Sequence, residues 1–271
     1  MNGASREALA AGRERLDALT DSASADAARL ADELAAVTAL LDREAGLRRV
    51  LTDPAQPAEA KAELVQRLLG GQVGGTTADL VAGLVRSRWS QPRDLVDALE
   101  ELADTADLTA AQRSGDLDDV EDELFRFGRI VSSSTGLRAA LTDRAAGTAA
   151  KTELLHRLLG GRARPATERL VTRLVTVPRG RSLEAGLESL SKLAAERRDR
   201  MVAVVTSAVP LSETQKRRLG AALATLYGRT MHLNLDVDPE VLGGIRVQVG
   251  DEVINGSLAD RLDEAARRMA S

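Results

Sequence analysis

Few side chains in this chain of 271 residues could act as a general base, a nucleophile or a soft metal ligand, because it has two histidines and no cysteine. His156 is expected on the polar side of a helix and His232 at an outward position of a strand, so they belong to unlike elements. The carboxylates from Asp116 to Glu123 lack the spacing and the glycine of a calcium loop. They predict instead the solvated start of a helix, where the helix dipole favours negative charge. No metal site is expected.

Two other segments have the composition of catalytic motifs without their context. Residues 71–75, Gly-Gln-Val-Gly-Gly, follow a helix rather than a strand and lack the Gly-Lys-Ser/Thr ending of a phosphate-binding loop. Residues 132–134 are three serines with no histidine placed to activate them as nucleophiles. An enzyme would need a polar pocket with perturbed acids, or a nucleophile and its base. We therefore expect no catalytic residue and no cofactor.

Composition favours packed helices and a binding role. Aromatic residues make up 1% and hydrophobic residues 44% of the chain, so the core must be built from Ala, Leu and Val. The net charge of −4 provides no basic field for nucleic acid, and scarce aromatics provide few stacking platforms for single strands. No stretch approaches 18 apolar residues, so membrane association is expected only through a partner.

The first two thirds of the chain repeat themselves. Residues 47–53, LRRVLTD, return as residues 137–143, LRAALTD, at an offset of 90. The same offset relates further positions, and downstream a slip of two residues aligns Leu95, Leu99 and Leu102 with Leu183, Leu187 and Leu190. Two copies of this size indicate a tandem duplication rather than a solenoid, which has more and shorter units.

Each copy has the periodicity of a helical bundle. In the first copy, helices are predicted around Leu9 and Leu16, from 26 to 44 and from 58 to 69, with later ones capped by Thr77 and opened by Pro92. We expect two tandem bundles, residues 1–105 and 106–198, followed by a domain of residues 199–271.

The last 70 residues predict the order β, α, β, β, β, α. Ser212 and Gln215 form a capping box that opens a helix running to Tyr227, with Leu219, Leu223 and Leu226 on its apolar stripe. Alternating runs at 232–237 and 245–249 predict strands, and Ser257 is expected to cap a final helix. The fold class is therefore mainly α with a small α+β C-terminal domain.

This C-terminal run resembles the C-terminal domain of the ATP synthase δ subunit, the bacterial relative of the mitochondrial oligomycin-sensitivity-conferring protein. The family most often has Asp where this chain has Asn255. The first bundle is similar to the family's six-helix N-terminal domain, and a second bundle is typical of extended actinobacterial forms. The matching C-terminal positions are Ala208, Pro210, Leu211, Gln215, Leu226, Asp238, Leu242, Gly243, Gly244, Gly250, Ile254, Gly256, Ser257, Arg261 and Leu262.

The resemblance implies a non-catalytic stator subunit of the F-type ATP synthase, in one copy per complex. It would link the top of the α/β head to the b-subunit stalk, so that the head does not rotate with the central shaft during proton-driven ATP synthesis. It would lie at the cytoplasmic face of the bacterial plasma membrane, binding α-subunit N-terminal helices and the C-terminal region of the b subunit.

The resemblance also implies a groove for an α-subunit helix between the first and fifth helices of the bundle. The residues that would line it are Leu9, Leu16, Leu80, Leu84 and Val85. An equally open interpretation is that these five side chains are simply bundle core. The alternative function is a helical adaptor or scaffold unrelated to ATP synthase, which would share the bundles but has no reason to carry the C-terminal turn pattern.

Overall fold

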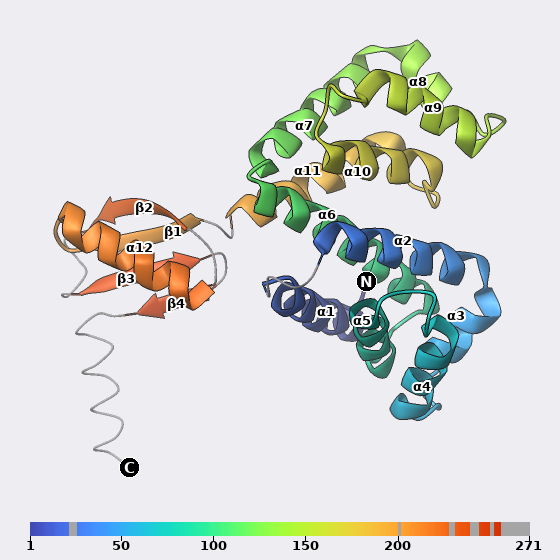
Figure 1. Cartoon of the computed structure of the whole chain (residues 1–271), viewed down its shortest axis with the longest axis horizontal. Coiled ribbons are helices and arrows are strands. Elements are labelled where there is room, and N and C mark those ends of the chain that lie inside the picture. The colour runs from blue at the N-terminus through green and yellow to red at the C-terminus, as the bar shows by residue number, and fades with distance from the viewer. Residues whose placement is uncertain (22–25, 200–201, 228–230, 239–243, 250–251, 256–271) are drawn as a thin grey trace. The chain divides into compact units, whose positions relative to one another are not determined.

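The computed structural model describes residues 1–21, 26–199, 202–227, 231–238, 244–249 and 252–255. Within these ranges the chain is mainly helical with one small four-stranded sheet near its C-terminal end, as the composition and periodicity predict (Figure 1). The chain divides into two compact units, Met1–Ala194 and Ala195–Ser271. The first unit holds the duplicated helices and the second holds the sheet.

The helical unit begins with α1 (Gly3–Asp21). Four helices follow, α2 (Ala27–Arg43), α3 (Ala45–Thr52), α4 (Ala58–Leu69) and α5 (Gly75–Arg86), and then the long α6 (Pro92–Ser114). The second copy contains α7 (Leu117–Ser133), α8 (Thr135–Thr142), α9 (Thr148–Leu159), α10 (Pro165–Thr176) and α11 (Leu183–Asp199). Each helix from α7 to α10 begins 90 residues after its counterpart from α2 to α5, which agrees with the duplication read from the sequence.

The duplication also extends to individual hydrogen bonds. The Glu33 carboxylate accepts the backbone N–H of Gly74 at 3.0 Å and the hydroxyl of Thr77. At the same offset, Glu123 accepts the N–H of Arg164 at 2.9 Å and the hydroxyl of Thr167 at 2.5 Å. The expectation that Thr77 caps its helix is therefore wrong. The N-cap of α5 is Gly74, and the Thr77 hydroxyl is turned inward to Glu33.

Helix α6 belongs to both copies. It begins at Pro92, as predicted, continues to Ser114 and stops at Gly115, whose φ of 79° is readily available only to glycine. It contacts α1 and α2 of the first copy and α7 and α10 of the second. Residues 93–111 of α6 lie at the 90-residue offset from α1, so α6 closes the first copy and opens the second. The expected boundary between residues 105 and 106 falls inside this helix.

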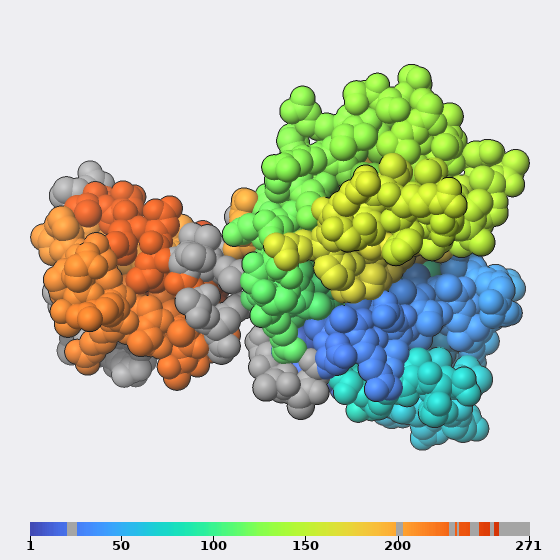
Figure 2. Space-filling view, turned by 45° about the horizontal axis from the view of Figure 1, so that its top comes forward, coloured from blue at the N-terminus to red at the C-terminus, as the bar shows by residue number. Residues whose placement is uncertain are grey.

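Helix α10 of the second copy lies beside α2 of the first copy (Figure 1). Figure 2 shows the yellow surface of α9 and α10 meeting the blue surface of α2. A hollow of about 500 Å³ between them is lined by Asp32 and Ala35 from α2 and by Thr172 and Arg173 from α10, among others. Across this hollow, α10 of the second copy faces α2 of the first copy.

The C-terminal unit contains β1 (Val202–Ser207), α12 (Glu213–Tyr227), β2 (His232–Val237), β3 (Ile245–Val249) and β4 (Glu252–Asn255). The sheet order is β2-β1-β3-β4, with β1 parallel to β2 and antiparallel to β3, and β3 antiparallel to β4. Val205 pairs with Leu235 on one side and Val247 on the other. Helix α12 packs on this core through Leu223.

The predicted capping box is confirmed. The backbone N–H of Ser212 donates to Oε1 of Gln215 at 2.9 Å, and the N–H of Gln215 donates to Oγ of Ser212 at 3.3 Å. The predicted apolar stripe is narrower than expected, because Leu226 is 65% exposed while Leu223 is 4% exposed. A helix lying on one face of a small sheet buries only its central line of side chains.

The C-terminal positions that carry the resemblance are partly within the described ranges. Pro210 lies between β1 and α12, Leu211 and Ile254 pack against the sheet core, and the N–H of Asp238 donates to the carbonyl of Ser207 at 3.0 Å. Gly244 has a φ of 87°. The final helix, the side chains of His232 and Asn255, and the remaining positions lie outside the description; those positions are Leu242, Gly243, Gly250, Gly256, Ser257, Arg261 and Leu262.

Candidate partner-binding site

The four leucines and the valine expected to line a groove lie in the core of the first copy. Leu9 is 8% exposed, Leu84 is 2% exposed, and Leu16, Leu80 and Val85 are fully buried. They belong to one hydrophobic cluster with α2, α4 and α6. Their burial agrees with the core interpretation, in which they hold α1 against α5 and present no surface of their own to a partner.

Glycines let α1 and α5 approach each other closely. A Cβ atom at Gly12 would lie 2.8 Å from a methyl of Leu84. On the outer side of the same junction, a Cβ atom at Gly83 would lie 2.8 Å from Nη1 of the exposed Arg15. The flexible Arg15 side chain can adopt another rotamer, so it does not fix the shape of this surface. We call the surface around Gly83 and Arg15 the outer rim of the α1/α5 junction.

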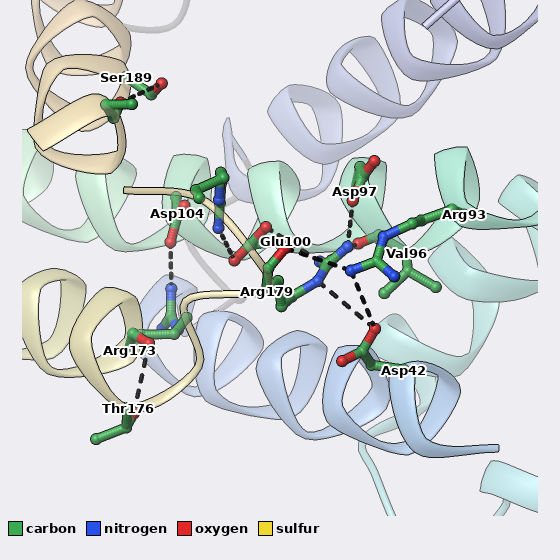
Figure 3. A network of polar contacts seen from close by, with 12 residues as sticks. Asp42, Arg93, Val96, Asp97, Glu100, Asp104, Arg173, Thr176, Arg179 and Ser189 are labelled. Atoms are coloured by element: carbon green, nitrogen blue, oxygen red, sulfur yellow. Dashed lines mark hydrogen bonds and ion pairs between the residues drawn. The ribbon is translucent and has the colours of Figure 1, made fainter. Parts of the chain in front are cut away.

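The corresponding junction of the second copy, between α6 and α10, is built from buried charges. Arg173 stands where the first copy has Gly83, at the offset of 90. Its guanidinium reaches Asp104 at 2.6 Å and Asp107 at 2.7 Å, and Arg169 reaches Asp107 at 2.6 Å. Figure 3 shows the Arg173–Asp104 pair between these helices. Asp107 is fully buried, so this junction is filled by its own side chains.

Burial shifts the titration of these groups. It raises the pKa of the Asp104 carboxyl to about 7, although the attraction of Arg173 opposes the shift. It also raises the pKa of Asp107, again against the attraction of Arg173 and Arg169. Burial opposes the charge of Arg173, but the two carboxylates raise the pKa of its guanidinium.

A second buried arginine fastens the two copies together. Arg179, in the loop after α10, has a side chain only 3% exposed and a φ of 50°. Its guanidinium lies 3.0 Å from Glu100, donates to the carbonyl of Val96 at 3.2 Å, and forms an ion pair with Asp42 at 3.7 Å. It also pairs with Asp97 (Figure 3). In the same loop, Arg181 pairs with Glu100.

The residues considered for chemistry have structural partners. His156 is exposed, and its Nδ1 lies 2.8 Å from Glu168, whose hydrogen bond raises the pKa of the imidazole. Asp116 precedes α7 and forms an ion pair with Arg164 at 3.0 Å. Ser134 caps α8 by accepting the N–H of Leu137 at 3.3 Å.

Sequence reasoning missed the buried charges around α6. Asp104 and Asp107 are three residues apart, and Arg169 and Arg173 are four apart, so each pair lies on one helix face. This spacing was the available signal. It was insufficient because exposed helix faces carry the same pattern, and the two pairs are more than 60 residues apart in the chain.

The duplicated architecture has close relatives among known proteins. A model of the family "ATP synthase delta (OSCP) subunit" matches residues 17–109 and again residues 104–269. The two matches overlap within α6, the helix that both copies share. None of the described helices is long and apolar enough to cross a membrane.

Whole-length relatives lead to the same family. "ATP synthase subunit delta" of Streptomyces avermitilis is 81% identical over 270 residues, covering 100% of this chain and 99% of the relative. The protein of that name from Streptomyces coelicolor is 81% identical over 271 residues, with coverage of 100% and 99%. That of Thermobifida fusca is 50% identical over 270 residues, with full coverage of both chains. An adaptor unrelated to ATP synthase is thereby excluded. The chain belongs to the ATP synthase delta (OSCP) subunit family, a structural and non-catalytic component of the peripheral stalk.

Proposed function

We propose that this chain is the stator link that joins the top of the α/β head to the b-subunit stalk and keeps the head from rotating with the central shaft. The observation that carries the proposal is the family match, which extends over both copies and the C-terminal unit. A stator must transmit torque without bending. Two copies that share α6 and are fastened to each other by Arg179 form a joint suited to that load.

The α-subunit N-terminal helix is proposed to dock on the first copy, along the outer rim of the α1/α5 junction. This is helix-in-groove recognition. The five core residues then support the rim from below, and contact comes from the surface around Gly83 and Arg15. The second copy offers no equivalent place, because Arg173 and Arg169 fill the α6/α10 junction.

The C-terminal region of the b subunit is proposed to bind the C-terminal unit. A helix that buries three or four leucine-sized groups gains about 5 to 10 kcal/mol, whereas association costs about 4 to 15 kcal/mol. One contact of this size is weak alone. Two contacts at different parts of one chain raise the effective concentration of each partner and give a durable joint.

The proposed assembly contains one copy of this chain at the cytoplasmic face of the bacterial plasma membrane, attached only through the complex. Within the chain, three functional parts are proposed. Residues 1–105 bind the head, 106–198 add rigid length, and 199–271 bind the stalk.

Calorimetric titration with a peptide of the α-subunit N-terminus from the same organism tests the first contact. The informative variant is Gly83→Arg, which copies the second bundle's residue into the first. The three atoms nearest to its Cβ all belong to the exposed Arg15 side chain. A Leu84→Asp change would instead place a charge in the core. Gly46→Arg is the matched control, because a Cβ atom there has no other atom within 4 Å.

Saturable binding by the wild type and by Gly46→Arg, lost in Gly83→Arg, would support the assignment. Equal binding by all three proteins would place the α helix elsewhere. No binding by the wild type would contradict the proposed docking of the α-subunit helix.

A further inference from the structure

The α1/α5 junction of the first copy has a closed counterpart in the second copy. Helices α1 and α5 correspond to α6 and α10 at the offset of 90. Glu14 and Asp17 of α1 therefore correspond to Asp104 and Asp107 of α6. The two junctions share these acidic positions and differ in what the facing helix brings to them.

In the second copy the facing helix α10 supplies two cations. Arg173 reaches Asp104 at 2.6 Å and Asp107 at 2.7 Å. Arg169 also reaches Asp107, at 2.6 Å, and Asp107 is fully buried. Burying a carboxylate is unfavourable unless a positive charge compensates it. The covered acids of this junction are therefore matched by guanidinium groups.

In the first copy the facing helix α5 supplies no cation at the equivalent positions. Asp79 stands where the second copy has Arg169. Gly83 stands where it has Arg173. The four positions thus hold two carboxylates and two guanidinium groups in the second copy, but three carboxylates and no cation in the first. Both Glu14 and Asp79 are exposed, so water solvates their charges.

Arg15 lies over Gly83 without an ion pair. The three atoms nearest to a Cβ atom at Gly83 all belong to the Arg15 side chain, which is exposed. In the described part of the chain, neither the Arg15 nor the Glu14 side chain forms a hydrogen bond or an ion pair. A partner that brings its own cation can therefore displace Arg15 without breaking an ion pair.

We propose that the α-subunit N-terminal helix places an arginine or lysine over Gly83, where its charge meets Glu14 and Asp17. This contact rests on the proposed docking of that helix at the outer rim and adds the chemistry that recognises it. A helix that covers the outer rim removes water from nearby carboxylates, which then require a compensating positive charge. The partner's cation thus takes the role that Arg173 has in the second copy.

Calorimetric titration of the full chain with the α-subunit N-terminal peptide, at low and high salt, tests this chemistry. Glu14→Lys places a like charge opposite the arriving cation. Glu188→Lys is the matched control, because Glu188 is an exposed glutamate on α11 of the second copy. Arg15→Ala removes the side chain that the partner's cation displaces. In the peptide, each arginine and lysine is replaced in turn by glutamate.

Glu14→Lys is expected to weaken binding about tenfold at low salt, whereas Glu188→Lys should leave the affinity unchanged. High salt should reduce the difference between the wild type and Glu14→Lys, because it screens exposed charges. Arg15→Ala should strengthen binding. One of the glutamate-substituted peptides should bind the wild type poorly and regain about tenfold in affinity on Glu14→Lys.

The same peptide affinity for the wild type and Glu14→Lys, with binding lost in Gly83→Arg, would overturn the basic contact while leaving the docking site in place. Equal weakening by Glu14→Lys and Glu188→Lys would also overturn it, because the effect would then follow from net charge alone. If the peptide does not bind the wild type, the proposed docking fails, and the basic contact fails with it.

Discussion

Removing the Arg179 guanidinium should destabilise the helical unit more than any exposed ion pair can. Its side chain is 3% exposed and joins α2 to α6 through Asp42 and Glu100. Loss of one partner from a buried ion pair costs about 3 to 5 kcal/mol, since the other charge stays buried without compensation. Arg181 still pairs with Glu100, so we expect Arg179→Ala to lie near the lower end, about 3 kcal/mol.

Urea unfolding followed by circular dichroism and by fluorescence measures this loss. The chain has one tryptophan, Trp89, whose indole donates to the carbonyl of Leu84 at 2.8 Å and so reports on the first copy. Arg164→Ala is the control. Its side chain is 46% exposed, and its pairs with Asp116 and Asp119 should contribute at most about 1 kcal/mol.

A third variant, Arg179→Gly, separates the effect of losing the ion pairs from the effect of the left-handed backbone conformation at residue 179. The φ of 50° at Arg179 lies in the left-handed region, which costs about 1 to 2 kcal/mol for a residue with a Cβ. Arg179→Gly should therefore be about 1 kcal/mol more stable than Arg179→Ala while lacking the same ion pairs. Equal urea midpoints for Arg179→Ala and Arg164→Ala would refute the stabilising role of the buried arginine.

Three further changes test other parts of the structure. The folded-state pKa of Asp104 is about 7 and its ordinary value is 3.8. The protonated carboxyl therefore contributes fully to the free energy of unfolding below pH 4, and this contribution is lost as pH rises through 7. This loss, on the order of 4 kcal/mol at most, should lower the melting temperature of the wild type as pH rises, and Asp104→Asn should flatten that decrease. A variant whose melting temperature depends on pH as the wild type's does would contradict the raised pKa of Asp104. Ser212→Ala removes half of the capping box and should lower the stability of the C-terminal unit by about 1 kcal/mol, measured by thermal unfolding. An unchanged melting temperature would show that the cap does not stabilise this unit. Gly186→Ala places a Cβ in steric overlap with a buried Leu174 methyl and should destabilise by about 1 to 3 kcal/mol in urea. Gly136→Ala is the control and should not destabilise the protein, because a Cβ atom there has open space around it. Equal urea midpoints for the two variants would show that α10 and α11 are not in close contact at Gly186.

Apolar periodicity and the repeat at 90 residues predicted the helices of each copy well. Helix α4 spans the predicted residues 58–69, and Asp26 caps α2 by accepting two backbone N–H groups. The duplication predicted the order of α7 to α10 because the same apolar spacing recurs 90 residues later. The capping box at Ser212 is equally local and was also predicted.

The shared role of α6 and the closed junction of the second copy could not be predicted in this way. Periodicity shows which face of α6 is apolar, but it does not show that two bundles use the same helix. Similarly, the family resemblance implied that Leu16 and Leu84 line a groove, and the sequence left open whether they are instead bundle core. Both are at most 2% exposed, which agrees with the core interpretation.

The most direct test of the stator proposal asks whether this chain alone connects the head to the stalk. The purified α/β head and a soluble C-terminal fragment of the b subunit are mixed with and without the full chain and examined by native mass spectrometry. The stator proposal predicts a complex of head, one copy of this chain and b fragment, which forms only when the chain is present. Head and b fragment that associate without the chain, or that displace each other from it, would contradict the proposal.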